Sequence, residues 1–121
     1  MTSAESAGYR GSFERLRQQV AGLQHQMQQA NPEPTAVRSQ FLALQQQFQQ
    51  EVMALDLADE PQAAQILPQQ IEINKQMRLL GVDVSFLQAA RQTHTAQQRQ
   101  SQILQRLQQI LAYCDNVQRL P

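Results

Sequence analysis

Residues 73–87 read Ile-Asn-Lys-Gln-Met-Arg-Leu-Leu-Gly-Val-Asp-Val-Ser-Phe-Leu. Apolar side chains recur in this stretch at steps of four, three, four and three residues: Ile73, Met77, Leu80, Val84 and Leu87. This spacing follows the 3.6-residue turn of an α-helix, so all five side chains share one face. The stretch therefore predicts an amphipathic helix that buries this face in a core.

The same period occurs in three further segments of the chain. A first helix is expected from residue 9 to the prolines at 32 and 34, because proline does not continue a helix. A second is expected from Pro34 to residues 58–61, and a last one after a polar break at 91–95. Their predicted core residues are Tyr9, Phe13, Leu16, Val20, Leu23 and Met27; Val37, Phe41, Leu44, Phe48, Val52 and Leu55; and Ile103, Leu107, Ile110, Cys114 and Val117.

Several boundaries of these segments are open to more than one interpretation. Pro68 either opens the third helix, with Ile66 before it, or kinks a helix that begins near Pro61. Thr95-Ala96-Gln97-Gln98 matches the capping-box pattern, which predicts that the last helix begins at Thr95. Gly81 marks either a close approach of two helices or a tolerated interruption. Residues 1–8 carry no apolar period, so a flexible tail is expected there and a single domain over residues 9–121.

Four amphipathic helices joined by short connections predict an all-α fold, an antiparallel up-down-up-down four-helix bundle. The alternative architecture joins the third and fourth segments into one long helix that dimerises as a coiled coil. Continuing the third helix would place only polar residues on its core face at positions 91, 94, 98 and 101. This interruption favours the bundle.

The composition excludes several classes of function. Gln fills 27 of the 121 positions, interleaved with apolar residues, as expected for the solvated faces of helices. The net charge of zero argues against a nucleic-acid partner. No apolar run is long enough for a membrane span or resembles a signal peptide, so we expect a cytoplasmic protein with no membrane partner. Charge is uneven, −3 over residues 1–60 and +3 over residues 61–121, a pattern that can orient a partner.

Residues that could carry chemistry are few. His25 and His94 have no metal-ligand partner at helical spacing, and Cys114 falls on a core face with no base near it in sequence. There is no glycine-rich phosphate loop and no identifiable carboxylate pair. We therefore predict no catalytic, cofactor-binding or metal-binding residues, and no enzyme. Phosphotransfer through His94 is a further alternative by analogy of fold, although His94 falls in a predicted turn.

A second apolar stripe lies opposite the core face of the third helix. It contains Leu79, Val82, Phe86 and Ala90, and charged residues accompany it. Such a helix is either central in a larger core or forms an interface with a protein partner or with a second copy of the chain. Phe86 is the best candidate for an anchor. The predicted interface consists of Lys75, Arg78, Leu79, Val82, Asp83, Phe86 and Ala90.

The same segment carries a family resemblance. Residues 72–92, Glu-Ile-Asn-Lys-Gln-Met-Arg-Leu-Leu-Gly-Val-Asp-Val-Ser-Phe-Leu-Gln-Ala-Ala-Arg-Gln, resemble the heterocyst frequency control protein PatD family of cyanobacteria. Ala96-Gln97-Gln98-Arg99, Leu107 and Tyr113-Cys114-Asp115 are also similar to that family, so the resemblance covers about the C-terminal half.

The resemblance implies a non-enzymatic regulator that limits how often vegetative cells differentiate, linked to the tubulin-like cell-division protein FtsZ. Our first hypothesis is therefore a regulatory protein-binding module, with FtsZ as its candidate partner. A structural homo-oligomer, such as a homodimer built through the second stripe, is the alternative, and phosphotransfer is a third.

Overall fold

The computed structural model describes residues 3–121, with side chains from residue 8 onward. It contains α1 (Ser3–Met27), α2 (Pro34–Gln47), α3 (Ala63–Ala89) and α4 (Thr93–Gln118). A π-helical segment, η1 (Phe48–Met53), continues α2. Over residues 3–121 there is no strand. The predicted all-α four-helix bundle is confirmed.

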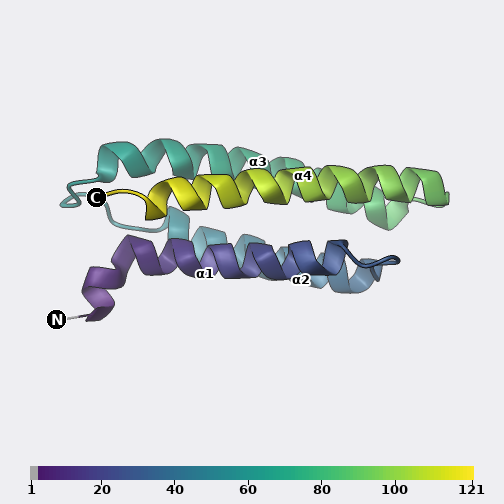
Figure 1. Cartoon of the computed structure of the whole chain (residues 1–121), viewed down its shortest axis with the longest axis horizontal. Helices are drawn as coiled ribbons and strands as arrows, with labels where there is room; N and C mark the ends of the chain where they lie inside the picture. The colour runs from purple at the N-terminus through teal and green to yellow at the C-terminus, as the bar shows by residue number, and fades with distance from the viewer. Residues whose placement is uncertain (1–2) are drawn as a thin grey trace.

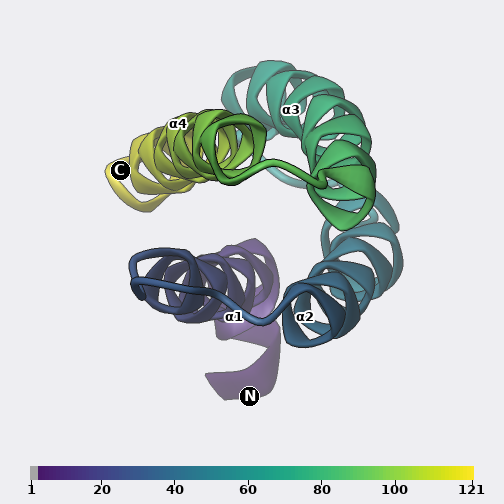
Figure 2. The ribbon, with the colours of Figure 1, turned by 90° about the vertical axis from the view of Figure 1, so that its right-hand side faces the viewer.

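Helices that follow one another in the chain run in opposite directions (Figure 1). Viewed from one end, they surround a common axis in the order α1, α2, α3, α4 (Figure 2). Hydrogen bonds join the start of one helix to the end of its neighbour in four pairs: Gln47 with Ser12, Gln88 with Pro34, Asn116 with Gln69, and Gln118 with Arg10. These pairings fix the up-down-up-down arrangement.

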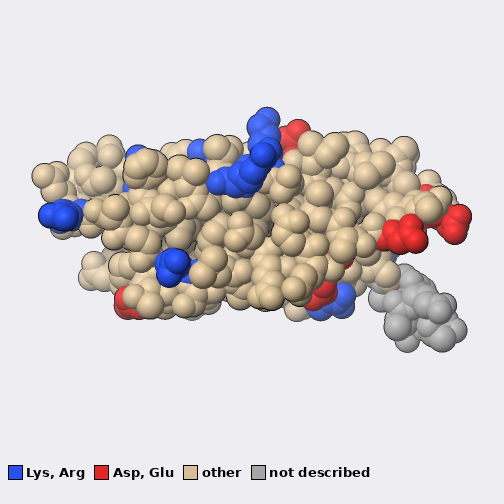
Figure 3. Space-filling view, turned by 180° about the vertical axis from the view of Figure 1, so that it is seen from behind, with Lys and Arg blue, Asp and Glu red and all other residues tan. Residues whose placement is uncertain are grey.

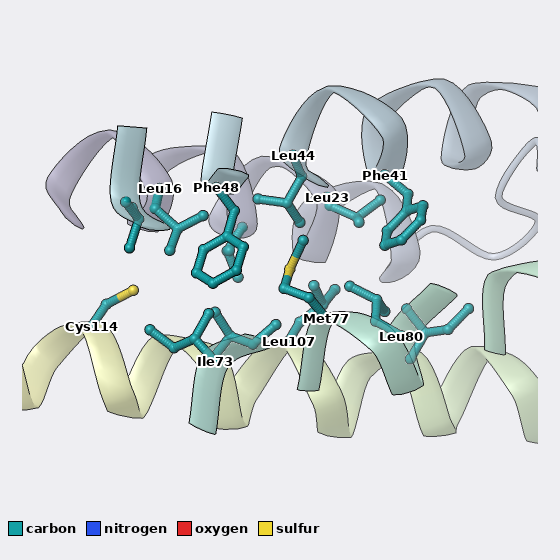
Figure 4. Close-up of a cluster of buried hydrophobic side chains, with 14 of the residues drawn as sticks. Leu16, Leu23, Phe41, Leu44, Phe48, Ile73, Met77, Leu80, Leu107 and Cys114 are labelled. Carbon is teal, nitrogen blue, oxygen red and sulfur yellow. The ribbon is translucent and has the colours of Figure 1, made fainter. Parts of the chain in front are cut away.

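The predicted apolar faces meet inside the bundle (Figure 4). Every predicted core residue is buried except Tyr9 and Leu55, which are half-buried against the cluster. Ile66 of α3 is buried as well. The 3.6-residue period therefore identified the core correctly, because each helix turns its apolar face toward the same axis.

The second helix departs from its expected course. Leu44, Phe48 and Val52 are separated by four residues each, so an α-helix would rotate them progressively off the core face. The wider turn of the π-helix keeps Phe48 and Val52 buried. The helical segment then ends at Met53, before the predicted stop at 58–61. Gln70 of α3 donates its side-chain N–H to the carbonyl of Val52 at 2.8 Å, which satisfies a backbone acceptor at this end.

Proline and a carboxylate set the start of α2. Pro34 occupies the first turn, as predicted. Glu33 caps the helix, because its carboxylate accepts hydrogen bonds from the backbone N–H of Thr35 and of Ala36, both at 3.0 Å. These bonds favour the charged form and lower the pKa of Glu33 from its ordinary value.

The start of α1 lies earlier in the chain than the sequence indicated, and the start of α3 agrees with one of its two interpretations. The helix α1 begins at Ser3, so residues 3–8 are helical, whereas Met1 and Thr2 lie outside the described residues. Ala4, Glu5 and Ala7 favour a helix without contributing to an apolar period, which is why the pattern missed this extension. The helix α3 begins at Ala63 and contains Pro68, which decides between the two interpretations of that proline.

The connection between α3 and α4 corrects the capping prediction. It is short, since α3 ends at Ala89 and α4 begins at Thr93 rather than Thr95. The backbone N–H of Ala96 donates to the carbonyl of Gln92 at 3.0 Å, so helical hydrogen bonding already starts at Gln92 and the Thr95 capping box does not form. His94 consequently lies in the first turn of α4, not in a loop. The single-helix alternative for residues 91–101 is wrong.

Gly81 is a point of close helix approach. A Cβ atom added there would lie 3.1 Å from Cζ of Phe41 in α2. The absent side chain lets the Phe41 ring pack against the backbone of α3, which resolves the ambiguity left by the sequence.

Candidate partner-binding surface

The side of α3 that faces away from the core carries a row of exposed apolar side chains. Each is between 36% and 62% exposed. The row consists of Leu67, Ile71, Leu79, Val82 and Phe86, and we call it the outer α3 face. Over these 20 residues an α-helix rises about 29 Å. Leu79, Val82 and Phe86 are therefore not part of a larger core within this chain.

The sequence had identified only the second half of this row. Leu67 and Ile71 extend it toward the start of α3, and Ile71 is its most exposed member. Both precede Lys75 at steps of four residues, a signal that was present in the sequence. The two possible courses of the chain around Pro68 left open whether Leu67 and Ile71 belong to the same helix as Lys75.

Asp83 does not belong to the exposed rim where the sequence placed it. Its side chain is buried, and one carboxylate oxygen accepts a hydrogen bond from Nε of Arg106 at 3.0 Å. The other oxygen lies 3.6 Å from a guanidinium nitrogen of Arg99. Asp83 sits on the flank of α3 that α4 covers, so it joins the two helices. Ala90 is half-buried and ends α3 as its C-terminal cap, which removes it from the row.

Phe86 is held in place by the same cluster. The guanidinium carbon of Arg99 lies 4.2 Å from the centroid of the Phe86 ring. This is a cation–π contact, and Asp83 fixes the guanidinium that makes it. Half of Phe86 nevertheless remains exposed. An anchor that is already ordered loses less conformational entropy when it binds.

Positive charge surrounds the outer α3 face. Residues 67–106, which begin with the first member of the face, contain five basic residues and two acidic residues, Glu72 and Asp83, for a net charge of +3. Lys75 and Arg78 are exposed, and neither forms an ion pair within residues 8–121. Seen from behind, basic side chains are spread over the upper and lower parts of the molecule, and acidic side chains lie at the end that holds the α2–α3 connection as well as at the top and along the lower edge (Figure 3). That connection contains Asp56, Asp59 and Glu60.

Three features of the described chain bear on other kinds of site. Among these residues there is no cluster of three or more metal-ligating side chains. Cys114 is buried on the core face of α4 as predicted, and burial raises the pKa of its thiol to about 12. No helix in the described part is long and apolar enough to cross a membrane.

No family model, no curated protein and no solved structure matches the chain. Functional inference therefore rests on the residues themselves and on the outer α3 face that they form.

Proposed function

We propose that this chain is a cytoplasmic, non-enzymatic regulatory module that binds another protein through the outer α3 face. The observation that supports this function is the row of exposed apolar side chains on α3, whose opposite side already contributes to the bundle core. Five large apolar side chains on one exposed helix face carry a hydration cost that a bound partner would remove.

The similarity of residues 72–92 to the PatD family supports a more specific proposal. Three of the five residues of the outer α3 face lie within this segment: Leu79, Val82 and Phe86. We propose FtsZ as the partner and control of heterocyst frequency in cyanobacteria as the process. In this proposal Phe86 is the main apolar anchor at one end of the face, and Lys75 and Arg78 lie toward its middle.

Replacing Phe86 by glutamate tests the surface directly. The ring is half exposed, so Phe86→Glu should leave the helical circular dichroism spectrum and the melting temperature nearly unchanged. It should abolish binding to purified cyanobacterial FtsZ, measured by surface plasmon resonance, because it places a carboxylate where the largest apolar side chain of the contact would be buried. Leu42→Glu is the matched control, since Leu42 of α2 is 45% exposed and lies outside α3.

The expected result is loss of FtsZ binding with Phe86→Glu and retention with Leu42→Glu. A folded Phe86→Glu protein that binds FtsZ as tightly as the wild type would overturn the assignment of this surface. A wild-type protein that does not bind FtsZ would overturn the choice of partner.

A further inference from the structure

The order of apolar and charged side chains along the outer α3 face indicates the chemistry of its partner. We infer that it receives an amphipathic helix of another protein, one with apolar side chains toward both ends and acidic side chains at its middle. This inference rests on the proposed function, because it assumes that the face is a protein-binding surface.

The shape of the face favours a helical partner. Leu67 and Ile71 form one apolar end, and Leu79, Val82 and Phe86 form the other, all along a single helix. A row of this kind is complementary to i, i+3, i+4 anchors on a second helix lying along it. A peptide that binds by adding a strand would need a sheet edge, and residues 3–121 contain no strand.

The charges at the middle of the face favour acidic side chains. Lys75 and Arg78 lie between the two apolar ends, and both are exposed. The nearby acid Asp83 is not available to pair with Lys75 or Arg78, because it is buried between Arg99 and Arg106. Carboxylates at the middle of a bound helix would pair with Lys75 and Arg78. The same two cations would disfavour a partner helix that carries basic side chains at its middle.

A second copy of the chain is a poor occupant for the same reason. In a two-fold symmetric dimer that buries the whole row, the axis passes near residues 76 and 77, and the same patch of each copy meets itself there. That arrangement gathers Lys75 and Arg78 of both copies around the axis, four cations with no free acid beside them. Glu72 is half-buried and accepts a hydrogen bond from the hydroxyl of Tyr113 at 3.5 Å. An axis nearer Val82 would leave Leu67 and Ile71 uncovered.

Two synthetic helical peptides of about 20 residues, long enough to span the row, test this inference. Both carry leucines that match the two apolar ends. One has glutamates at its two central positions and the other has lysines there. Fluorescence anisotropy with the full chain should show at least about tenfold tighter binding of the glutamate peptide. In a Lys75→Glu/Arg78→Glu variant the preference should reverse.

A control variant separates local pairing from net charge. Arg38→Glu/Arg119→Glu changes the net charge by the same amount at two exposed arginines outside α3, and it should keep the wild-type preference. Equal binding of the two peptides to the wild-type chain would overturn the inference. So would a wild-type dimer in sedimentation that Phe86→Glu dissociates, or capture of the chain by phosphatidylglycerol vesicles with no binding of the glutamate peptide.

The failure of this inference is distinguishable from failure of the proposed function. If Phe86→Glu abolishes FtsZ binding but the wild-type chain does not distinguish the peptides, the surface stands and the acidic partner is wrong. If Phe86→Glu affects neither FtsZ nor the glutamate peptide, the surface itself is wrong.

Discussion

Asp83 of α3 and Arg99 of α4 form a contact that links the interior of the bundle to its exposed anchor. The carboxylate of Asp83 lies 3.6 Å from the guanidinium of Arg99, and that guanidinium covers Phe86. Arg106 donates to the same carboxylate at 3.0 Å. A single buried acid thus holds two arginines of α4 against α3.

Asp83→Asn should destabilise the protein by about 2 kcal/mol, because it removes the negative charge that both arginines share in a largely buried setting. Denaturant unfolding followed by circular dichroism measures the change. Asp115→Asn is the control, since Asp115 pairs with Arg17 at 3.0 Å with both side chains more than a third exposed. That loss should stay below about 1 kcal/mol. Equal losses in the two variants would contradict a special role for Asp83.

Phe48→Ala should cost about 3–5 kcal/mol, since the ring is fully buried and its removal leaves a cavity in the core. An alanine substitution at an exposed site, Leu42→Ala, should change the free energy of unfolding by no more than about 0.5 kcal/mol. Thermal melts of the two variants against the wild type provide the comparison. A melting temperature that Phe48→Ala leaves unchanged would be incompatible with the π-helical segment facing the core.

Glu33→Gln should reveal a pH-dependent contribution from the start of α2. The folded-state pKa of Glu33 is lowered by hydrogen bonds from Thr35 and Ala36, so its charged form stabilises the folded protein at neutral pH. This contribution is present above the unfolded-state pKa and is lost as pH falls through the lowered folded-state pKa. Wild type and Glu33→Gln should therefore differ in melting temperature at pH 7 and converge at acid pH. A difference that is constant with pH would show that the charge is irrelevant.

Cys114 should react slowly with thiol reagents in the folded protein, because burial raises the pKa of the thiol to about 12 and excludes the reagent. Labelling in denaturant provides the fast reference. The thiol has a lower pKa in the unfolded chain than in the folded protein. The free energy of unfolding should therefore decline as pH rises from about 8.5 toward the folded-state pKa. Labelling of the folded protein as fast as that of the unfolded chain would place Cys114 at the surface.

The local pattern of residues was sufficient for the number of helices and for their core faces. Spacings of three and four residues act within one helix, so Ile73, Met77 and Leu80 reveal their shared face without knowledge of any neighbour. Pro34 likewise marks the start of α2 by its own geometry. The second stripe was also visible in this way, but the sequence left open whether it belonged to the core or to the surface.

Tertiary structure decided that question, because exposure depends on where the neighbouring helices pack. Asp83 and Val82 are adjacent in the chain, yet α4 covers Asp83 and leaves Val82 half exposed. The contact of Gly81 with Phe41, the cover of Arg99 over Phe86 and the hydrogen bond of Gln70 to Val52 each join two different helices. Periodicity places a residue on a helix, whereas only the packed bundle determines which flank of that helix remains open to solvent and to a partner.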